Sequence, residues 1–201
     1  MRYLALGDSY TIGTGASSGS RSFPALLARR LAAQTGREVD VTNPAVNGFA
    51  TLDLIELEVP LLKKLEPDLV SVLIGVNDLV RGRKADDYRS SLVQIYDAIA
   101  TLKLAPGRVV AISIPNWSVV PAARQFGELE LIRHLTDTFN DIAHEEAQSR
   151  GFTWVDVTAA SISGLGSAGW IAADDLHPGD SQYAAWTEVI WHGVKAAWSA
   201  A

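Results

Sequence analysis

The sequence contains no cysteine, which excludes disulfides, thiolate metal sites and cysteine nucleophiles. It also has no long hydrophobic run: no stretch approaches the ~18 apolar residues of a membrane-spanning helix. Basic residues are outnumbered, with 17 Lys and Arg against 23 Asp and Glu, so the sequence offers no surface for nucleic acid. No secretory leader is recognisable. We therefore expect a cytoplasmic protein, although a secreted chain with its leader removed would have the same sequence.

What is present is the composition of an ordinary globular protein. The 201 residues are 48% hydrophobic, which is enough for one substantial core. The composition does not change along the chain, and there are no internal repeats. We predict one domain over residues 1–201, and the oligomeric state is not indicated.

Apolar segments of strand length alternate with amphipathic segments of helix length. We predict strands at 3–6, 39–42, 69–74, 109–114 and 152–157, and helices at about 23–32, 51–57, 88–102, 128–150 and 180–198. Residues 11–22 read as a loop, Thr51 as a helix cap, and Pro60 as either the start of a further helical segment or a kink. The central strands are solidly apolar rather than alternating, a pattern typical of a parallel sheet covered on both faces. The sequence therefore predicts an α/β fold.

Polar residues follow several of these strands. The first strand leads into a tight turn at Ser9, the second into Gly48, and the third into Asn77. The segment after the fifth strand carries Asp174 and His177. Right-handed crossovers place all of these at the carboxyl edge of the sheet, where open parallel sheets bind ligands.

These residue types are the ones that acyl transfer by a serine requires. Ser9 would be the nucleophile, His177 the base that takes its proton, and Asp174 the group that orients the imidazole. The backbone N–H groups of Ser9 and Gly48 and the side-chain amide of Asn77 would donate to the oxyanion. A glycine at position 48 suits a close approach of the backbone to the substrate.

Together these motifs resemble the four sequence blocks of the SGNH hydrolases, also called GDSL esterases and lipases. The blocks, in the family's order, are Gly7-Asp8-Ser9, Gly48, Gly75-Val76-Asn77-Asp78 and Asp174-Asp175-Leu176-His177. The resemblance implies a three-layer α/β/α, flavodoxin-like fold and an acyl hydrolase without metal or cofactor, with the site residues in the roles given above. Tyr10 departs from the family pattern, which has Leu there, so the pocket wall is expected to differ.

Three other patterns suggest different chemistry. Residues 15–19 match the Gly-x-Ser-x-Gly nucleophile elbow, but no strand precedes them. Residues 164–169 match a dinucleotide fingerprint, but lie far from a strand and near the end of the chain. Asp174, Asp175, His177 and Asp180 could form a metal cluster, but only one of them is a histidine.

Other polar and aromatic residues are assigned structural roles. We expect Asp8 and Asp78 to brace turns, and the remaining histidines and the aromatic residues of the last helix to be packed or solvated. Whether the apolar loop at Trp117 lines a pocket or only packs over the sheet is open.

The function predicted is a serine esterase that cleaves carboxylic esters of small molecules, with thioesters as a further class. A carbohydrate O-deacetylase is the alternative within the family, and a non-catalytic binding module is the alternative outside it.

Overall fold

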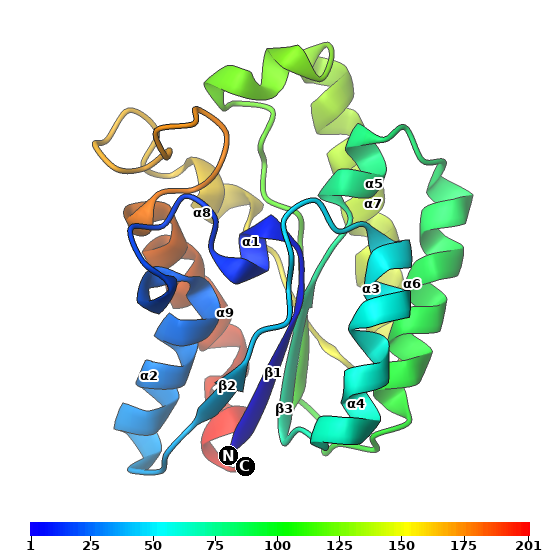
Figure 1. The fold of residues 1–201 in the computed structure, drawn as a ribbon, viewed down its shortest axis with the longest axis vertical. Coiled ribbons are helices and arrows are strands. Elements are labelled where there is room, and N and C mark those ends of the chain that lie inside the picture. The colour runs from blue at the N-terminus through cyan, green and yellow to red at the C-terminus, as the bar shows by residue number, and fades with distance from the viewer.

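The fold is a five-stranded parallel sheet between two layers of helices (Figure 1). The computed structural model describes residues 1–201. The strand order is β2-β1-β3-β4-β5, and every neighbouring pair is parallel. The strands are β1 (Arg2–Gly7), β2 (Asp40–Thr42), β3 (Leu69–Leu73), β4 (Val109–Ile112) and β5 (Thr153–Val155). This order is the doubly wound, flavodoxin-like one, and it confirms the predicted fold class.

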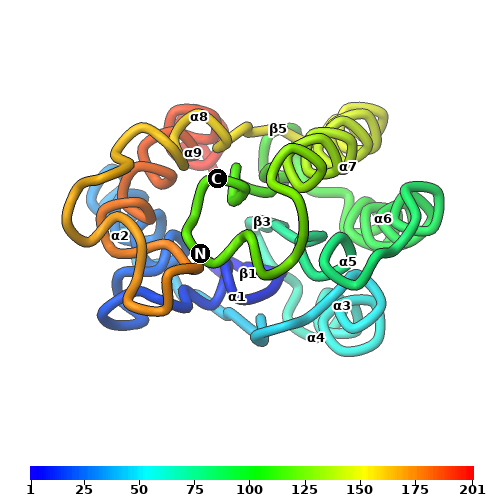
Figure 2. Tube along the Cα trace, turned by 90° about the horizontal axis from the view of Figure 1, so that it is seen from above, coloured from blue at the N-terminus to red at the C-terminus, as the bar shows by residue number.

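Helices cover both faces of the sheet. On one face lie α2 (Phe23–Thr35), α8 (Thr158–Ile162) and α9 (Asp180–Ser199), and on the other lie α3 (Thr51–Leu57), α4 (Val59–Leu65), α6 (Ala85–Ala100) and α7 (Leu129–Ser149) (Figure 2). Four short helical segments complete the chain: α1 (Ser9–Ile12), η1 (Gly19–Arg21), α5 (Val76–Val80) and η2 (Pro121–Gln125). None of the helices is both long and apolar enough to cross a membrane.

The central strands explain why the sheet needs two layers. All five residues of β3 and all four of β4 are buried, so neither face of these strands can remain in water. One polar pair is buried within the sheet, where the Tyr3 hydroxyl lies 2.7 Å from the Ser71 hydroxyl on the neighbouring strand. Both hydroxyls are thereby satisfied inside an apolar layer.

The structure corrects several predicted boundaries. Strands β3, β4 and β5 end one or two residues earlier than expected, and the segment predicted as a loop over residues 11–22 contains the end of α1 and all of η1. Ser9 does not sit in a turn, because it begins the short helix α1. Asp8 caps this helix by accepting the Tyr10 N–H, and Gly13 ends it in the left-handed conformation, with φ of 90°.

In the α3–α4 region, the structure corrects the expectation for Thr51 and decides between the two alternatives for Pro60. Thr51 is not the cap of α3; Ala50 holds that position, and Thr51 is the first helical residue. Pro60 lies in the first turn of a separate helix, α4, which decides between the two alternatives for that proline. The helix α8 was not predicted, because five residues are too few to show a helical period.

Candidate active site

Ser9 is held at the carboxyl edge by the abrupt end of β1. Gly7, the last residue of β1, has φ of 154°, and a Cβ there would collide with the Leu73 carbonyl oxygen and the Thr11 side chain. Only glycine fits this position, so the chain can leave the sheet and start α1 within two residues. Ser9 is buried, with 6% of its surface exposed, and its backbone N–H makes no hydrogen bond within the protein.

The imidazole is carried by a hairpin-like loop after α8. Its two sides are joined by the antiparallel bridge between Ile171 and Pro178 and by the bond from Ala172 N–H to the His177 carbonyl, at 2.8 Å. At the tip, His177 Nδ1 lies 2.6 Å from Asp174 Oδ2. The other carboxylate oxygen, Asp174 Oδ1, accepts the backbone N–H groups of Leu176 and His177.

The charge of Asp174 follows from these contacts. Partial burial acts to raise the pKa of the carboxyl, but the hydrogen bonds from the His177 backbone and ring and from Leu176 outweigh it, so the pKa lies below its usual value. Asp174 is therefore a carboxylate at neutral pH, placed to hold a proton on Nδ1 and leave Nε2 as the acceptor.

The loop between α1 and η1 docks against this imidazole loop. Asp180 accepts hydrogen bonds from the Ser17 N–H at 2.8 Å and from the Ser17 hydroxyl at 2.6 Å. A Cβ on Gly15 would lie 2.9 Å from the Cβ of His177. The Gly-x-Ser-x-Gly match at residues 15–19 is thus no nucleophile elbow, since it follows no strand and its Ser17 hydroxyl binds Asp180.

The residues predicted as oxyanion donors, Asn77 and Gly48, lie on the opposite side. Asn77 is in the first turn of α5, and its Nδ2 donates one hydrogen to the Phe49 carbonyl at 2.9 Å, leaving the second amide hydrogen free. Gly48 has φ of 83°, and its N–H has no partner within the protein. A Cβ at Gly48 would meet nothing within 4 Å, so the backbone angle rather than space favours glycine there.

Asp78 holds the Asn77 helix against the start of α3, which follows directly after the Gly48 loop. Asp78, fully buried, accepts the Thr51 N–H at 2.9 Å, the Thr51 hydroxyl at 2.6 Å and an Arg83 N–H at 3.2 Å. Nearer the surface, Arg81 donates to the Gly48 carbonyl at 2.6 Å. The bracing roles expected of Asp78 and of Asp8 are therefore confirmed.

A small pocket of about 70 Å³ opens where the two sides meet. Ser9, Asn77 and His177 all line it, together with Tyr10, Val76, Val80, Trp117, Phe126 and Leu176. Asp174 lies behind His177 and does not line the pocket, and neither does Gly48. The structure thus brings three of the five predicted site residues to one cavity: Ser9, Asn77 and His177. A fourth, Asp174, is hydrogen-bonded to the His177 ring.

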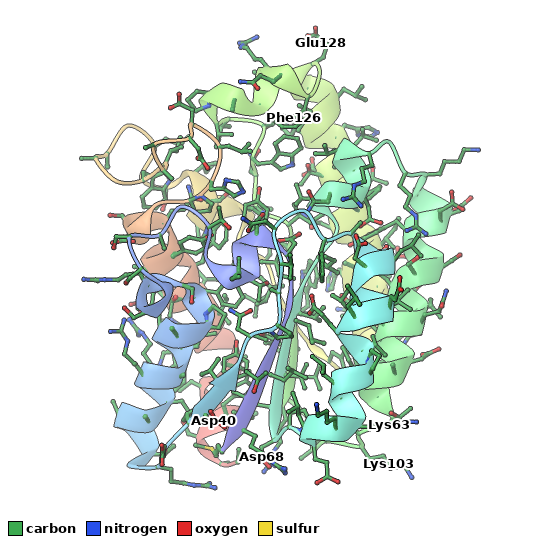
Figure 3. All side chains as sticks on the ribbon, in the orientation of Figure 1. Asp40, Lys63, Asp68, Lys103, Phe126 and Glu128 are labelled. Atoms are coloured by element: carbon green, nitrogen blue, oxygen red, sulfur yellow. The ribbon has the colours of Figure 1, made fainter.

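Aromatic rings form much of the pocket wall. Tyr10, 3% exposed, packs edge-to-face against His177 with ring centroids 6.3 Å apart. Trp117 packs in the same way on Phe126, at 5.7 Å, and its indole N–H donates to the Thr136 hydroxyl. Figure 3 shows Phe126 projecting from the segment above the sheet toward the carboxyl edge. The open question about the Trp117 loop is settled in favour of Trp117 lining the pocket.

The remaining sequence patterns take structural roles. The glycines at 164–169 follow the helix α8 rather than a strand, and a Cβ on Gly164 would collide with the Trp170 ring. The structure gathers no group of three or more histidine or acidic side chains that could hold a metal ion. His144 stacks on Trp154 at 5.2 Å, and His192 Nδ1 lies 2.8 Å from the Glu188 carbonyl oxygen.

Some residues near the site were missed by sequence reasoning. Val76, Val80 and Phe126 come together at the pocket only through the fold. Arg81 gave no signal, because an arginine in a polar loop is ordinary. Glu58 did have a sequence signal, because it is an acid flanked by the apolar residues Leu57 and Val59. In the structure it is only 1% exposed.

Comparison with known proteins identifies the family. The sequence model of the GDSL-like lipase/acylhydrolase family matches residues 5–185. A lipase from Streptomyces rimosus is 31% identical, with the match covering 90% of this chain and 79% of the lipase.

Solved structures share the fold at lower sequence identity. A family 3 carbohydrate esterase from Clostridium thermocellum superposes with a TM-score of 0.76 at 19% identity, covering 100% of this chain and 98% of that one. Axe2, an acetylxylan esterase from Geobacillus stearothermophilus, superposes with a TM-score of 0.76 at 18% identity, covering 98% and 95%.

Proposed function

Because the chain belongs to the GDSL-like lipase/acylhydrolase family, we propose that it hydrolyses small carboxylic esters through an acyl-enzyme formed on Ser9. The observation that carries this proposal is the pocket lined jointly by Ser9, Asn77 and His177, with the Asp174 carboxylate 2.6 Å from the far side of the imidazole. A serine, a base and an orienting carboxylate are the three groups that nucleophilic acyl transfer requires.

In the first half of the reaction, Ser9 Oγ attacks the ester carbonyl carbon. His177 Nε2 takes the hydroxyl proton as the bond forms, and Asp174 stabilises the resulting imidazolium through Nδ1–H. The imidazolium then gives the proton to the leaving alkoxide, and the alcohol departs. In the second half, a water attacks the acyl-enzyme with His177 again as base, which releases the acid and restores Ser9.

The oxyanion formed in both halves needs donors that are already in place. Three N–H groups are without a partner: the backbone N–H groups of Ser9 and Gly48 and one hydrogen of the Asn77 amide. Donors fixed before the reaction stabilise developing charge without paying for reorganisation. The bonds from Asn77 to the Phe49 carbonyl and from Arg81 to the Gly48 carbonyl hold this side in position.

The size of the pocket favours short acyl groups. At about 70 Å³ the pocket is far smaller than the roughly 300–1,000 Å³ pockets that take drug-sized ligands, so it suits a short acyl group. This observation gives weight to a second candidate, an O-deacetylase that acts on acetylated carbohydrate. Thioesters with short acyl groups fit the same mechanism.

A chain-length series tests both the reaction and the pocket. We expect p-nitrophenyl acetate to be hydrolysed with a higher kcat/KM than the butyrate or octanoate ester. Ser9→Ala should leave no turnover above what the remaining groups supply, since the nucleophile is gone. Phe126→Ala should shift the preference toward longer chains by removing one wall.

Two results would contradict these assignments. Activity in Ser9→Ala would overturn the nucleophile, and a rate that rises with chain length in the unaltered enzyme would overturn the preference for short acyl groups. Turnover of p-nitrophenyl acetate with none on acetylated oligosaccharides would separate the esterase from the deacetylase. Two structures of Axe2 are described as catalytic mutants, one with a serine and one with a histidine replaced by alanine, which supports the choice of Ser9 and His177 as first targets.

A further inference from the structure

Thr14, in the loop between α1 and η1, is hydrogen-bonded to three separate parts of the molecule. Its backbone N–H donates to the Ser9 carbonyl at 2.9 Å, and its own carbonyl accepts the hydroxyl of Tyr183, a buried residue of α9, at 2.8 Å. Its side-chain hydroxyl donates to Asn47 Oδ1, and Asn47 directly precedes Gly48 in the chain. One threonine thus connects the segment of the nucleophile, the helix α9 and the loop that carries an expected oxyanion donor.

The main chain at Thr14 is held without help from its hydroxyl. Besides the two backbone bonds, the next residue, Gly15, packs closely against the imidazole loop. A Cβ on Gly15 would lie 2.5 Å from the Pro178 carbonyl oxygen and 2.8 Å from the Ala172 Cβ, and its φ of 90° suits glycine. A substitution of the Thr14 side chain is therefore expected to change one hydrogen bond and leave the loop in place.

Gly48 is the third residue of a turn formed by residues 46–49. The turn is closed by the bond from the Phe49 N–H to the Val46 carbonyl at 3.2 Å, and Gly48 has φ of 83°, as a type II turn requires. A type I turn differs from it mainly in the orientation of the central peptide, here the peptide between Asn47 and Gly48. The orientation of this peptide therefore decides where the Gly48 N–H points.

Two side chains hold the turn, one from each side of the pocket. Arg81, on the donor side, donates to the Gly48 carbonyl at 2.6 Å. Thr14, on the Ser9 side, donates to Asn47. Asn47 is exposed, and its side chain makes no other hydrogen bond within the protein. Without the Thr14 hydroxyl, the central peptide of the turn would be held from the Gly48 end alone.

We propose that Thr14 is a positioning residue for the oxyanion hole: its hydroxyl, through Asn47, holds in place the peptide that carries the Gly48 N–H. The inference rests on the proposed function, in which that N–H donates to the oxyanion. A donor stabilises the developing charge best when it is in place before the reaction starts. Loss of the Thr14 hydroxyl should therefore weaken binding of the transition state more than binding of the substrate.

The test removes the bond from each of its ends. Thr14→Val keeps the branched shape and removes the donor, Thr14→Ser keeps a hydroxyl, and Asn47→Ala removes the acceptor. Thr101→Val is the matched control, because the Thr101 hydroxyl bonds only the Ala98 carbonyl at the exposed end of α6.

The first readout is kcat and KM on p-nitrophenyl acetate. Thr14→Val and Asn47→Ala should each lower kcat by about tenfold, less than the about 10²–10³ that loss of a whole donor costs. KM should change less than about twofold, the pattern of an interaction made only in the transition state. Thr14→Ser should keep most of kcat, and Thr101→Val should match the unaltered enzyme.

A double variant separates this bond from a general weakening of the loops. Thr14→Val combined with Asn47→Ala should lose no more kcat than either change alone, because both remove the same bond. Losses that multiply in the double variant would overturn the proposal. So would a Thr14→Val enzyme as fast as the unaltered one, or a Thr14→Ser enzyme as slow as Thr14→Val.

The Gly48 amide gives a readout that does not depend on turnover. A p-nitrophenyl alkylphosphonate should phosphonylate Ser9 Oγ with loss of p-nitrophenolate, which places a phosphonyl oxygen where the oxyanion would form. With isotope-labelled glycine, the Gly48 amide proton should shift downfield in the NMR spectrum of this adduct in the unaltered protein and in Thr14→Ser. In Thr14→Val the shift should be smaller.

The outcomes of this experiment distinguish the inference from the proposed function. An equal shift in Thr14→Val and in the unaltered protein would overturn the role of Thr14 and leave the proposed function intact. An adduct that forms without any shift at Gly48 would overturn Gly48 as a donor and the role of Thr14 with it. Failure of Ser9 to form the adduct in the unaltered protein would overturn the proposed function itself.

Discussion

The two sides of the pocket are built differently. On the imidazole side, formed by residues 170–180 and the docked loop 13–18, Asp174 has 44% of its side chain exposed and His177 has 18%. On the donor side, formed by residues 48–51 and 77–83, the central acid Asp78 is 0% exposed and is bonded to both Thr51 and Arg83.

This difference corresponds to what each side does in the proposed reaction. The imidazole must accept and release a proton. The alcohol must also leave beside it and a water must take its place, so access to solvent is useful there. The donors must not move, because their value in the transition state depends on being in place beforehand. A buried carboxylate bonded to Thr51 and to the partly exposed Arg83 fixes these donors, because removing one of its partners would leave a buried charge without compensation.

The largest effect is expected on the imidazole side, from Asp174→Asn. The amide can donate to Nδ1 and so favours the wrong tautomer, which lowers kcat by about 10⁴ in enzymes with this arrangement. The measurement is kcat on p-nitrophenyl acetate at neutral pH. Asp175→Asn is the control, because the neighbouring carboxylate is exposed and it is Asp174, not Asp175, that is hydrogen-bonded to the His177 ring. Equal losses in the two variants would show that the loop, rather than the Asp174 carboxylate, matters.

A smaller loss is expected on the donor side, from Asn77→Ala. Removing one oxyanion donor costs on the order of 10²–10³ in kcat. The control is Asn116→Ala, which changes an asparagine at the same edge that does not line the pocket. If Asn77→Ala is as fast as the unaltered enzyme, Asn77 is not an oxyanion donor. The proposed difference between the two sides of the pocket would then be wrong.

The smallest effect on kcat is expected from Thr51→Val, which weakens the hydrogen bonds that hold the donor side in place. Valine keeps the shape but removes the hydroxyl that bonds Asp78 and Arg83. The free energy of unfolding should fall by about 1–3 kcal/mol, with Tm lower by about 2–4 °C for each kcal/mol, while kcat changes less than about tenfold.

Thr138→Val is the matched control for that change. Its hydroxyl bonds only the His134 carbonyl one turn earlier in the same helix, α7, so Tm should hardly move. A loss of kcat in Thr51→Val as large as in Asn77→Ala would mean that the rate depends on the Thr51 hydrogen bonds as much as on the Asn77 amide.

The fold followed from local properties of the chain. Strands buried on both faces are largely apolar rather than alternating, so β1, β3 and β4 could be recognised from their residues alone. Strand ends were less predictable: β4 was expected to run to Ile114, but Ile114 N–H donates to Asn140 Oδ1 on α7 instead of continuing the ladder. A partner from another element ended the strand, and no local pattern announces such a partner.

The amino-acid sequence by itself determined the parallel α/β sheet, the family, and a set of polar residues that must gather at one edge, because strand direction and crossover hand leave little choice. Only the tertiary structure decided that Tyr10, Trp117 and Phe126 form walls of one small pocket and that Glu58 reaches the Gly7 N–H. Positions 51 residues apart, such as Gly7 and Glu58, have no spacing that predicts their contact. Their meeting depends on how the α3–α4 junction packs against the sheet.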